Sequence, residues 1–160
     1  MAKSHINWND YAFRMQVKKG SASALEKMAE FLTDDIKQSM KPGNYRPWPS
    51  KKRDGSIHWS SSPGDPPAPD TEALQDSISY AVSDGSTGGL GAKAEYPNVG
   101  TPSATTDEIK AVVGTQDPKG LWMEMGVQEN NVAPRPFLRT AIGRNKRTLK
   151  QIYISEMKLK

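Results

Sequence analysis

The sequence contains no cysteine and only two histidines, His5 and His58, among its 160 residues. The lack of cysteine excludes disulfide frameworks, thiol catalysis and cysteine-ligated zinc, and it is typical of a cytoplasmic origin. Two histidines leave little for a histidine-based metal centre. No run approaches the roughly 20 apolar residues of a membrane span, and the amino terminus lacks the apolar centre of a signal peptide. We therefore expect neither a membrane association nor a cofactor.

Apolar residues are scarce as well, because Ala, Val, Ile, Leu, Met, Phe, Trp, Tyr and Cys together make up only 35% of the chain. Thirteen glycines and 12 prolines favour long irregular segments around a modest core. A chain of this length fits one ordinary domain, so large multidomain enzymes are excluded. We expect a single domain over residues 1–160, with long loops at about 41–69 and 84–107.

The net charge of +4 conceals a strong segregation along the chain. Residues 1–58 carry 11 Lys and Arg against 6 Asp and Glu, which gives +5, and residues 59–130 carry 3 against 11, which gives −8. Residues 131–160 carry 8 against 1, which gives +7. This pattern is compatible with an unevenly charged solvated surface, with charge-complementary assembly of several copies, or with a surface that meets nucleic acid.

The first quarter of the sequence predicts a strand followed by a helix. Apolar residues alternate with polar ones over residues 11–18, which is typical of a half-buried strand. Ser23 followed by Glu26 has the form of a capping box at a helix start. Apolar residues then recur at helical spacing until Pro42, so we expect a helix over about 24–40.

The remaining patterns predict three more strands and a second helix. Apolar alternation favours strands at 78–82 and 108–114, and the short apolar run 121–125 is most simply another strand. Pro136 suits the first position of a last helix. We expect the apolar stripe of this helix to consist of Phe137, Leu138, Ala141, Ile142, Leu149, Ile152 and Tyr153. The order β-α-loop-β-β-β-α indicates an α+β fold, in which an N-terminal and a C-terminal helix pack on a mostly antiparallel sheet of about four strands.

The segment from Lys41 to Pro69 holds seven prolines and a basic cluster at 51–53. It is too long for an ordinary connection, so we expect it to be functional or to become ordered on binding. Trp48 and Trp59 lie in this segment, and exposed aromatic residues are frequent anchors of protein interfaces. Packing of these side chains onto the core is the simpler alternative.

One short pattern is compatible with catalysis. Asp70 together with Glu108 and Lys110 resembles the pattern of Mg²⁺-dependent nucleases, in which acidic residues hold the metal ion that activates water. No third acidic residue is evident. The simpler interpretation makes Glu108 and Lys110 the solvent face of a strand and Asp70 a helix cap, and we expect no enzymatic activity.

Two segments together resemble a known protein family. The first reads Ser-Pro-Gly-Asp-Pro-Pro-Ala-Pro-Asp-Thr at residues 62–71. The second reads Glu-Met-Gly at residues 124–126, followed by Pro-Arg-Pro-Phe-Leu-Arg at 134–139 and by Ala141. In this order and spacing they resemble the neck proteins of tailed bacteriophages, also called tail-completion or head–tail joining proteins and related to minor tail protein Z. The resemblance covers about residues 62–142.

The chain departs from the family pattern at three positions. Glu72 stands where the family has Gly, Met125 where it has Phe, and Thr140 where it has a second Pro. At the first position we expect a helical start capped by Thr71 in place of a tight turn, while Met125 still fills an apolar position. None of these changes touches a catalytic group, because the family has no known one.

The resemblance implies a structural virion protein without a cofactor or an enzymatic activity. Such proteins typically form a sixfold ring between the head connector and the tail tube, and genome DNA passes through its lumen without sequence-specific binding. The implied partners are further copies of this chain, head connector or adaptor proteins, and tail terminator or tube proteins. The protein would be made in the host cytoplasm and reside in the neck or tail of the virion. A ring repeats one heterologous interface until it closes, which suits the complementary charges of the chain.

This role sets expectations for individual side chains. Clustered cations would hold sliding DNA by its phosphates, so we expect acidic residues of the middle segment to face the lumen, namely Asp76, Asp84, Glu95, Asp107 and Glu108. The residues expected at subunit or ring contacts are Trp48, Trp59, Trp122, Met123, Met125, Arg139, Lys146 and Lys150. The alternatives are the Mg²⁺-dependent nuclease and a DNA-binding module that works through the basic ends of the chain.

Overall fold

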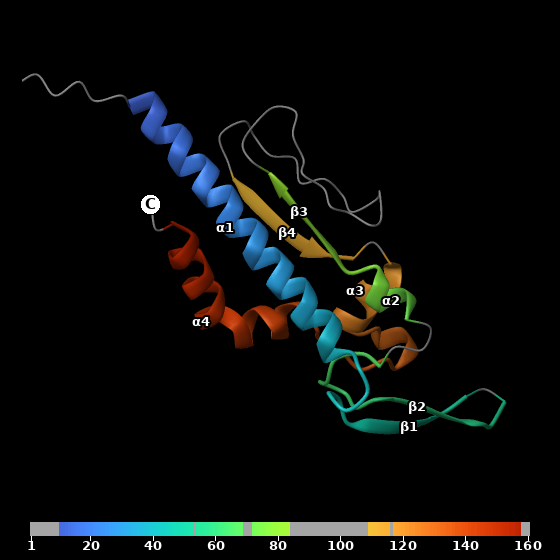
Figure 1. Ribbon diagram of the computed structural model, residues 1–160. Coiled ribbons are helices and arrows are strands. Elements are labelled where there is room, and N and C mark those ends of the chain that lie inside the picture. The colour runs from blue at the N-terminus through green and yellow to red at the C-terminus, as the bar shows by residue number, and fades with distance from the viewer. Residues whose placement is uncertain (1–9, 53, 69–71, 84–108, 116, 158–160) are drawn as a thin grey trace, which may run out of the picture.

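The computed structural model describes residues 10–52, 54–68, 72–83, 109–115 and 117–157 (Figure 1). Its elements are, in order, α1 (Asp10–Ser39), β1 (Pro47–Lys51), β2 (Ile57–Ser61), α2 (Ala73–Asp76), β3 (Ser79–Ser83), β4 (Lys110–Gly114), α3 (Pro118–Met125), the 3-10 turn η1 (Gln128–Asn130) and α4 (Leu138–Met157). This is the expected α+β fold, in which the N-terminal and C-terminal helices pack together with antiparallel strands.

The two long helices run antiparallel along each other (Figure 1). Near the end of α4, Lys27 Nζ lies 2.7 Å from a carboxylate oxygen of Glu156. Nearer its start, a guanidinium nitrogen of Arg144 lies 2.6 Å from Asp35 Oδ2. These ion pairs lie about two helical turns apart along α1 and join the two helices at two points.

The strands form two separate two-stranded sheets and not the single sheet expected from the sequence. β3 and β4 pair antiparallel from Ser79 opposite Gly114 to Ser83 opposite Lys110, and this pair packs against α1. β1 and β2 form a hairpin that projects from the molecule beyond the C-terminal end of α1 (Figure 1).

The core lies where α1, β3 and the start of α4 meet. Its main buried cluster consists of Leu32, Ile36, Met40, Ile78, Phe137 and Ala141. A second cluster unites Ala29 with Tyr80 and Val82 of β3. The predicted helical stripe of α1 and the predicted alternation of β3 are thus confirmed. Ile142 and Tyr153 were expected in the apolar stripe of the last helix, but both are exposed.

The strand expected over residues 11–18 is wrong, because this segment is the first part of α1. A strand needs a neighbour for its backbone hydrogen bonds, whereas each residue added to an existing helix gains a bond within the same segment. Ser23 and Glu26 consequently lie inside the helix and form no capping box at its start. The predicted C-terminal end at about residue 40 is confirmed.

The strand expected over residues 121–125 is also wrong, because these residues belong to helix α3. The carboxylate of Asp117 accepts a hydrogen bond of 2.9 Å from the backbone nitrogen of Lys119, and Pro118 occupies the first helical turn. An N-cap aspartate followed by proline is a strong helix start, and it outweighs a five-residue apolar run.

The segment expected as a loop over 41–69 contains the β1–β2 hairpin. At its turn, Asp54 Oδ1 accepts hydrogen bonds from the backbone and the hydroxyl of Ser56, at 2.9 and 2.6 Å. Gly55 takes a left-handed backbone with a φ of 84°. An Asp-Gly pair between two short extended runs is a known hairpin signal. The other expected loop, 84–107, lies outside the described residues.

Candidate interaction surfaces

The start of α4 is held by a side chain of α3. Glu124 Oε2 accepts hydrogen bonds from the backbone nitrogens of Phe137 and Leu138 at 2.8 and 3.0 Å, and Oε1 accepts one from that of Arg139 at 3.2 Å. The side chain of Arg139 forms an ion pair with the same carboxylate, with Nε 3.1 Å from Glu124 Oε1. A carboxylate at this position satisfies amides that have no partner inside the helix and interacts favourably with the helix dipole.

The opposite side of this junction is held by Arg135. Its backbone nitrogen donates to the carbonyl of Met123 at 2.6 Å, and its Nε donates to the carbonyl of Ser61 at 2.9 Å. Burial lowers the pKa of the Arg135 guanidinium. The backbone nitrogen of Gly64 donates to the carbonyl of Pro134 at 3.0 Å. The segments that begin at residues 62, 124 and 134 therefore meet in one place.

Two backbone positions in these segments have the left-handed conformation. Gly126 has a φ of 76°, and a Cβ at this position would lie 2.8 Å from the carbonyl oxygen of Val132, so no other residue fits without a shift. Glu72 has a φ of 56° and serves as the N-cap residue of α2, without a side-chain cap. The expectation that a helical start replaces the tight turn here is wrong, because Glu72 keeps a left-handed backbone and the helix begins at Ala73. The expected capping residue, Thr71, lies outside the described residues.

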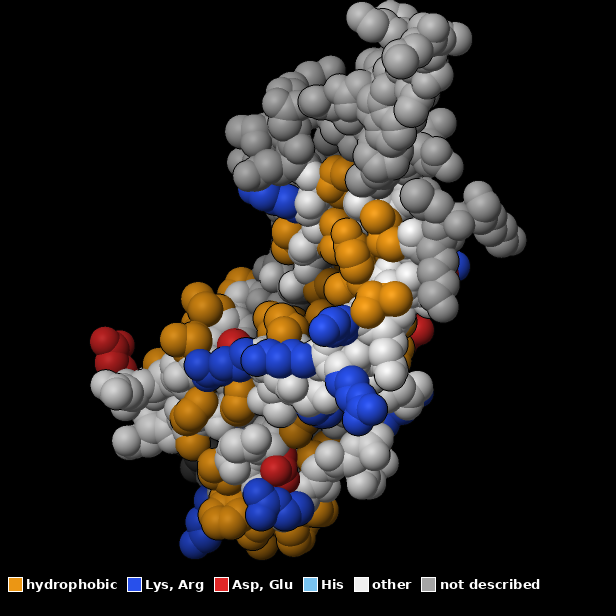
Figure 2. All heavy atoms as spheres, turned by 90° about the vertical axis from the view of Figure 1, so that its left-hand side faces the viewer, with side chains coloured by type: hydrophobic (Ala, Val, Ile, Leu, Met, Phe, Trp, Pro, Cys, Tyr) orange, Lys and Arg blue, Asp and Glu red, His pale blue; other side chains and the backbone are white. Residues whose placement is uncertain are grey.

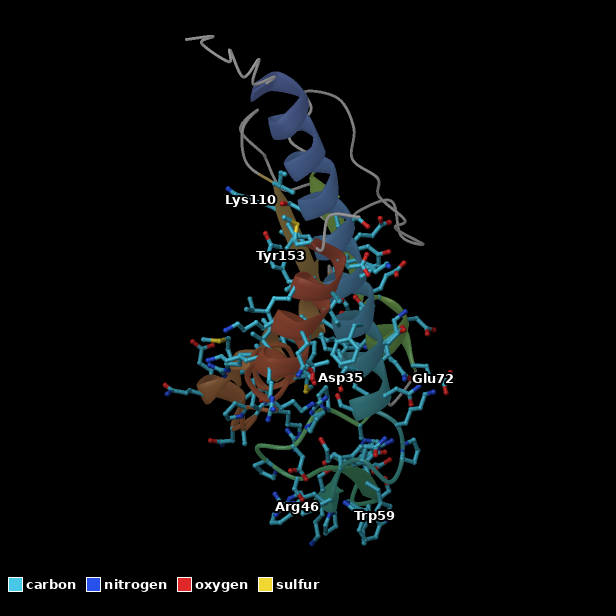
Figure 3. The ribbon with its side chains drawn as sticks, turned by 60° about the vertical axis from the view of Figure 1, so that its left-hand side comes forward. Asp35, Arg46, Trp59, Glu72, Lys110 and Tyr153 are labelled. Atoms are coloured by element: carbon cyan, nitrogen blue, oxygen red, sulfur yellow. The ribbon has the colours of Figure 1, made fainter. Side chains whose placement is uncertain are left out.

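The hairpin is anchored at its base by an arginine–aspartate pair. Asp65 Oδ2 accepts from the backbone nitrogen and from Nε of Arg46, at 2.9 and 3.0 Å, and Oδ1 accepts from the terminal nitrogen at 3.1 Å. The hydrogen bonds from Arg46 hold the pKa of Asp65 below its usual value. Figure 3 shows Arg46 and Trp59 together at this end of the molecule.

Both tryptophans of the hairpin are exposed, Trp48 to 50% and Trp59 to 63%. In the register, Trp48 lies opposite Ser60 and Trp59 opposite Pro49, so the two aromatic side chains belong to opposite faces of the hairpin. Ile57 shares a face with Trp59 and is equally exposed. The sequence indicates the two tryptophans as contact candidates, whereas the exposure of Ile57 follows only from the strand period of β2.

The three contact candidates on α3 differ in their exposure to solvent. Trp122 and Met125 are exposed, whereas Met123 packs against the main core cluster. Leu121 is also exposed and had not been identified as a candidate. The helical spacing that follows from Pro118 would have shown which of these side chains face outward.

The outward side of α4 combines basic and apolar side chains. We call it the outer face of α4 and define it by Arg139, Ile142, Lys146, Arg147, Lys150, Tyr153 and Ile154, all of which are exposed. Figure 2, which views the side of the molecule on which α4 lies, shows Lys and Arg side chains next to apolar ones. The contact candidates Arg139, Lys146 and Lys150 therefore all reach solvent.

The residues of the nuclease alternative are not brought together in the described part of the chain. Lys110 begins β4 and is exposed, while Asp70 and Glu108 lie outside the described residues. Among the described residues, no group of three or more His, Asp or Glu side chains could hold a metal ion. Asp76 is exposed on α2, and the other four residues expected in the lumen, Asp84, Glu95, Asp107 and Glu108, also lie outside the described residues.

Neither a family model, nor a curated protein, nor a solved structure matches this chain. Within the described ranges, no helix is both long enough and apolar enough to span a membrane.

Proposed function

We propose that this protein is a structural subunit of a tailed-bacteriophage neck, which completes the tail or joins it to the head. In this role it forms a ring of about six copies, and genome DNA passes through the lumen. The ring contacts head connector or adaptor proteins on one side and tail terminator or tube proteins on the other. The protein acts without catalysis and without a cofactor.

The observation that carries this proposal is the meeting of the two family-like segments around the start of α4. Arg135 binds the carbonyl of Ser61, Gly64 binds the carbonyl of Pro134, and Glu124 caps Phe137. Residues 70 and 74 positions apart in the sequence are thus joined by hydrogen bonds. This contact supports the resemblance, because chance similarity of two short motifs gives no reason for the motifs to meet.

Two backbone details support the same proposal. Glu72 takes the left-handed conformation at the position where the family pattern has glycine. Gly126 stands at the family's glycine and leaves no space for a side chain. The chain therefore has the backbone that the family's glycines favour, even where its own residue differs.

Electron microscopy of the purified protein tests this proposal. We expect closed rings with a central channel, and DNA incubated with the protein and Mg²⁺ should stay intact. Open or irregular aggregates would contradict the ring. Metal-dependent cleavage that disappears in Glu108→Ala, with Glu129→Ala as the matched control, would establish the nuclease instead.

A further inference from the structure

The outer face of α4 has an unbalanced positive charge. Residues 138–155 contain no Asp or Glu, and Lys146, Arg147 and Lys150 form no ion pair with any described residue. Ile142 and Ile154 lie beside them and are 46% and 49% exposed. A helix advances 100° per residue, so all five side chains fall on one side of α4. Cations around exposed isoleucines favour a partner that is acidic and partly apolar.

Gly143 lies in the middle of this face. A Cβ at this position would meet nothing within 4 Å, so no contact inside the chain requires glycine there. Glycine inside a helix costs about 1 kcal/mol relative to alanine. Glycine at this position would allow a partner to approach the helix backbone closely, which explains the absence of a side chain.

Another face of the same molecule has the opposite charge. Glu26, Glu30 and Asp34 recur every four residues along α1, and like charges at this spacing destabilise a helix. Asp34, Glu72 and Asp76 line one open groove of about 750 Å³, together with Lys37 and Lys41. We call Glu26, Glu30, Asp34 and Glu72 the acidic face. Burial, together with the carboxylates of Glu30, Glu26 and Asp34, raises the pKa of Tyr80 to about 12.

The two faces point in different directions. α4 packs on the side of α1 that carries Lys27 and Asp35. The acidic face begins where Tyr80 of β3 donates to Glu30 at 2.9 Å, and Figure 3 shows Glu72 on the opposite side of α1 from α4. A molecule cannot bring these faces together within itself. Two copies can do so head to tail, and such a contact leaves one free face at each end for further copies.

We propose that the outer face of α4 in one copy docks on the acidic face of α1 in the next copy. This inference rests on the proposed function, because it supplies the contact that the ring repeats. Three cations meet four carboxylates, and Ile142 and Ile154 lose their exposure to water. The contact is heterologous, so the copies extend head to tail until the ring closes.

Charge-reversal variants test this contact directly. The first variant is K146E/R147E/K150E, and the second is E26K/D34K/E72K, which leaves Glu30 and its bond to Tyr80 in place. Either variant alone presents two faces of the same sign, and we expect its self-association at low salt to be at least about 10-fold weaker than that of the wild type. K51E/K52E on the hairpin is the matched control and should associate like the wild type.

An equimolar mixture of the two variants gives the decisive result. The first variant has two acidic faces and the second has two basic ones, so every contact in an alternating assembly is complementary. We expect the mixture to regain the sedimentation behaviour of the wild type, with both variants in equal amounts. Regained assembly also shows that both variants are folded, and circular dichroism of each checks this independently.

Four results would overturn the inference. Three concern assembly: a mixture of two folded variants that stays monomeric, variants that associate like the wild type, and a wild type that stays monomeric at low salt. The fourth is loss of salt-dependent DNA binding in K146E/R147E/K150E with unchanged association, which would make the outer face of α4 a DNA surface. If both variants still form the rings that the wild type forms, only this contact is refuted. If the wild type itself forms no rings in electron micrographs, the result counts against the proposed function.

Discussion

Glu124 Oε2 accepts a hydrogen bond of 2.8 Å from the backbone nitrogen of Phe137. This bond connects α3 to a residue of the main buried cluster. Phe137 is 1% exposed, and its side chain contacts the stripe of α1. The geometry of the helix start thus depends on a carboxylate 13 residues earlier in the sequence. Several consequences of this and of neighbouring contacts are open to measurement.

Glu124→Ala should destabilise the protein by about 2 kcal/mol, because three backbone amides at the start of α4 lose their acceptor. Glu124→Gln keeps one acceptor oxygen and should cost about half as much. Denaturant unfolding measures both. Glu129→Ala removes an exposed carboxylate on η1 and should change stability by less than about 0.5 kcal/mol. Equal effects at both positions would contradict the capping role.

Glu72→Gly should stabilise the protein by about 1 kcal/mol, which raises the melting temperature by roughly 2–4 °C for a chain of this size. The cause is the left-handed backbone of Glu72, which costs most residues about 1–2 kcal/mol and glycine almost nothing. Glu72→Gln separates the charge from the backbone effect and should leave stability nearly unchanged. Asp76→Gly, inside α2, should be destabilising. A loss of stability in Glu72→Gly would contradict the assigned conformation.

Thr33→Val should stabilise the protein by about 1 kcal/mol. The hydroxyl of Thr33 is buried and has no hydrogen-bond partner in the described part of the chain, and valine has the same shape without the polar group. Thr33→Ser keeps the hydroxyl and removes the methyl group, so it should be destabilising. Thermal unfolding compares the two variants. The opposite order would mean that the hydroxyl is hydrogen-bonded in solution.

Tyr80 makes stability depend on pH in the alkaline range. Its pKa is raised from 10.0 to about 12 by burial and by the bond to Glu30, so the folded state favours the protonated phenol. This contribution is complete below about pH 10 and is lost as the pH rises through about 12. Tyr80 contributes at most about 3 kcal/mol to the free energy of unfolding in this way, because one pKa unit corresponds to about 1.4 kcal/mol.

Tyr80→Phe isolates this effect. The variant lacks the phenol, so the difference in unfolding free energy between wild type and variant should shrink, or change sign, as the pH rises from about 10 to 12. Other groups titrate in both proteins and cancel in the difference. A difference that stays constant over this range would contradict the raised pKa.

The parts of the fold that depend on one periodic pattern could be predicted from the sequence. Leu32, Ile36 and Met40 recur at helical spacing and are buried, and the alternation through Tyr80 matches β3. Such stripes are a direct result of burying one face of an element. Phe137 follows Pro136 and lies in the core as expected, although α4 begins two residues after the proline, at Leu138.

Other parts could not be predicted for identifiable reasons. An alternation over eight residues at 11–18 fits a strand and a helix almost equally, and only the continuity of α1 decides between them. The signals of Asp117-Pro118 and Asp54-Gly55 were present in the sequence and define α3 and the hairpin. The contact of Arg135 with Ser61 joins residues 74 positions apart, and no local pattern indicates it.

The most direct test of the proposed ring is the mass of the purified protein in solution, measured by light scattering at low and moderate salt. The proposal predicts one closed species of about six chains that loses mass as salt screens the contact between α4 and α1. A monomer at both salt concentrations would contradict the head-to-tail contact and the self-assembling ring.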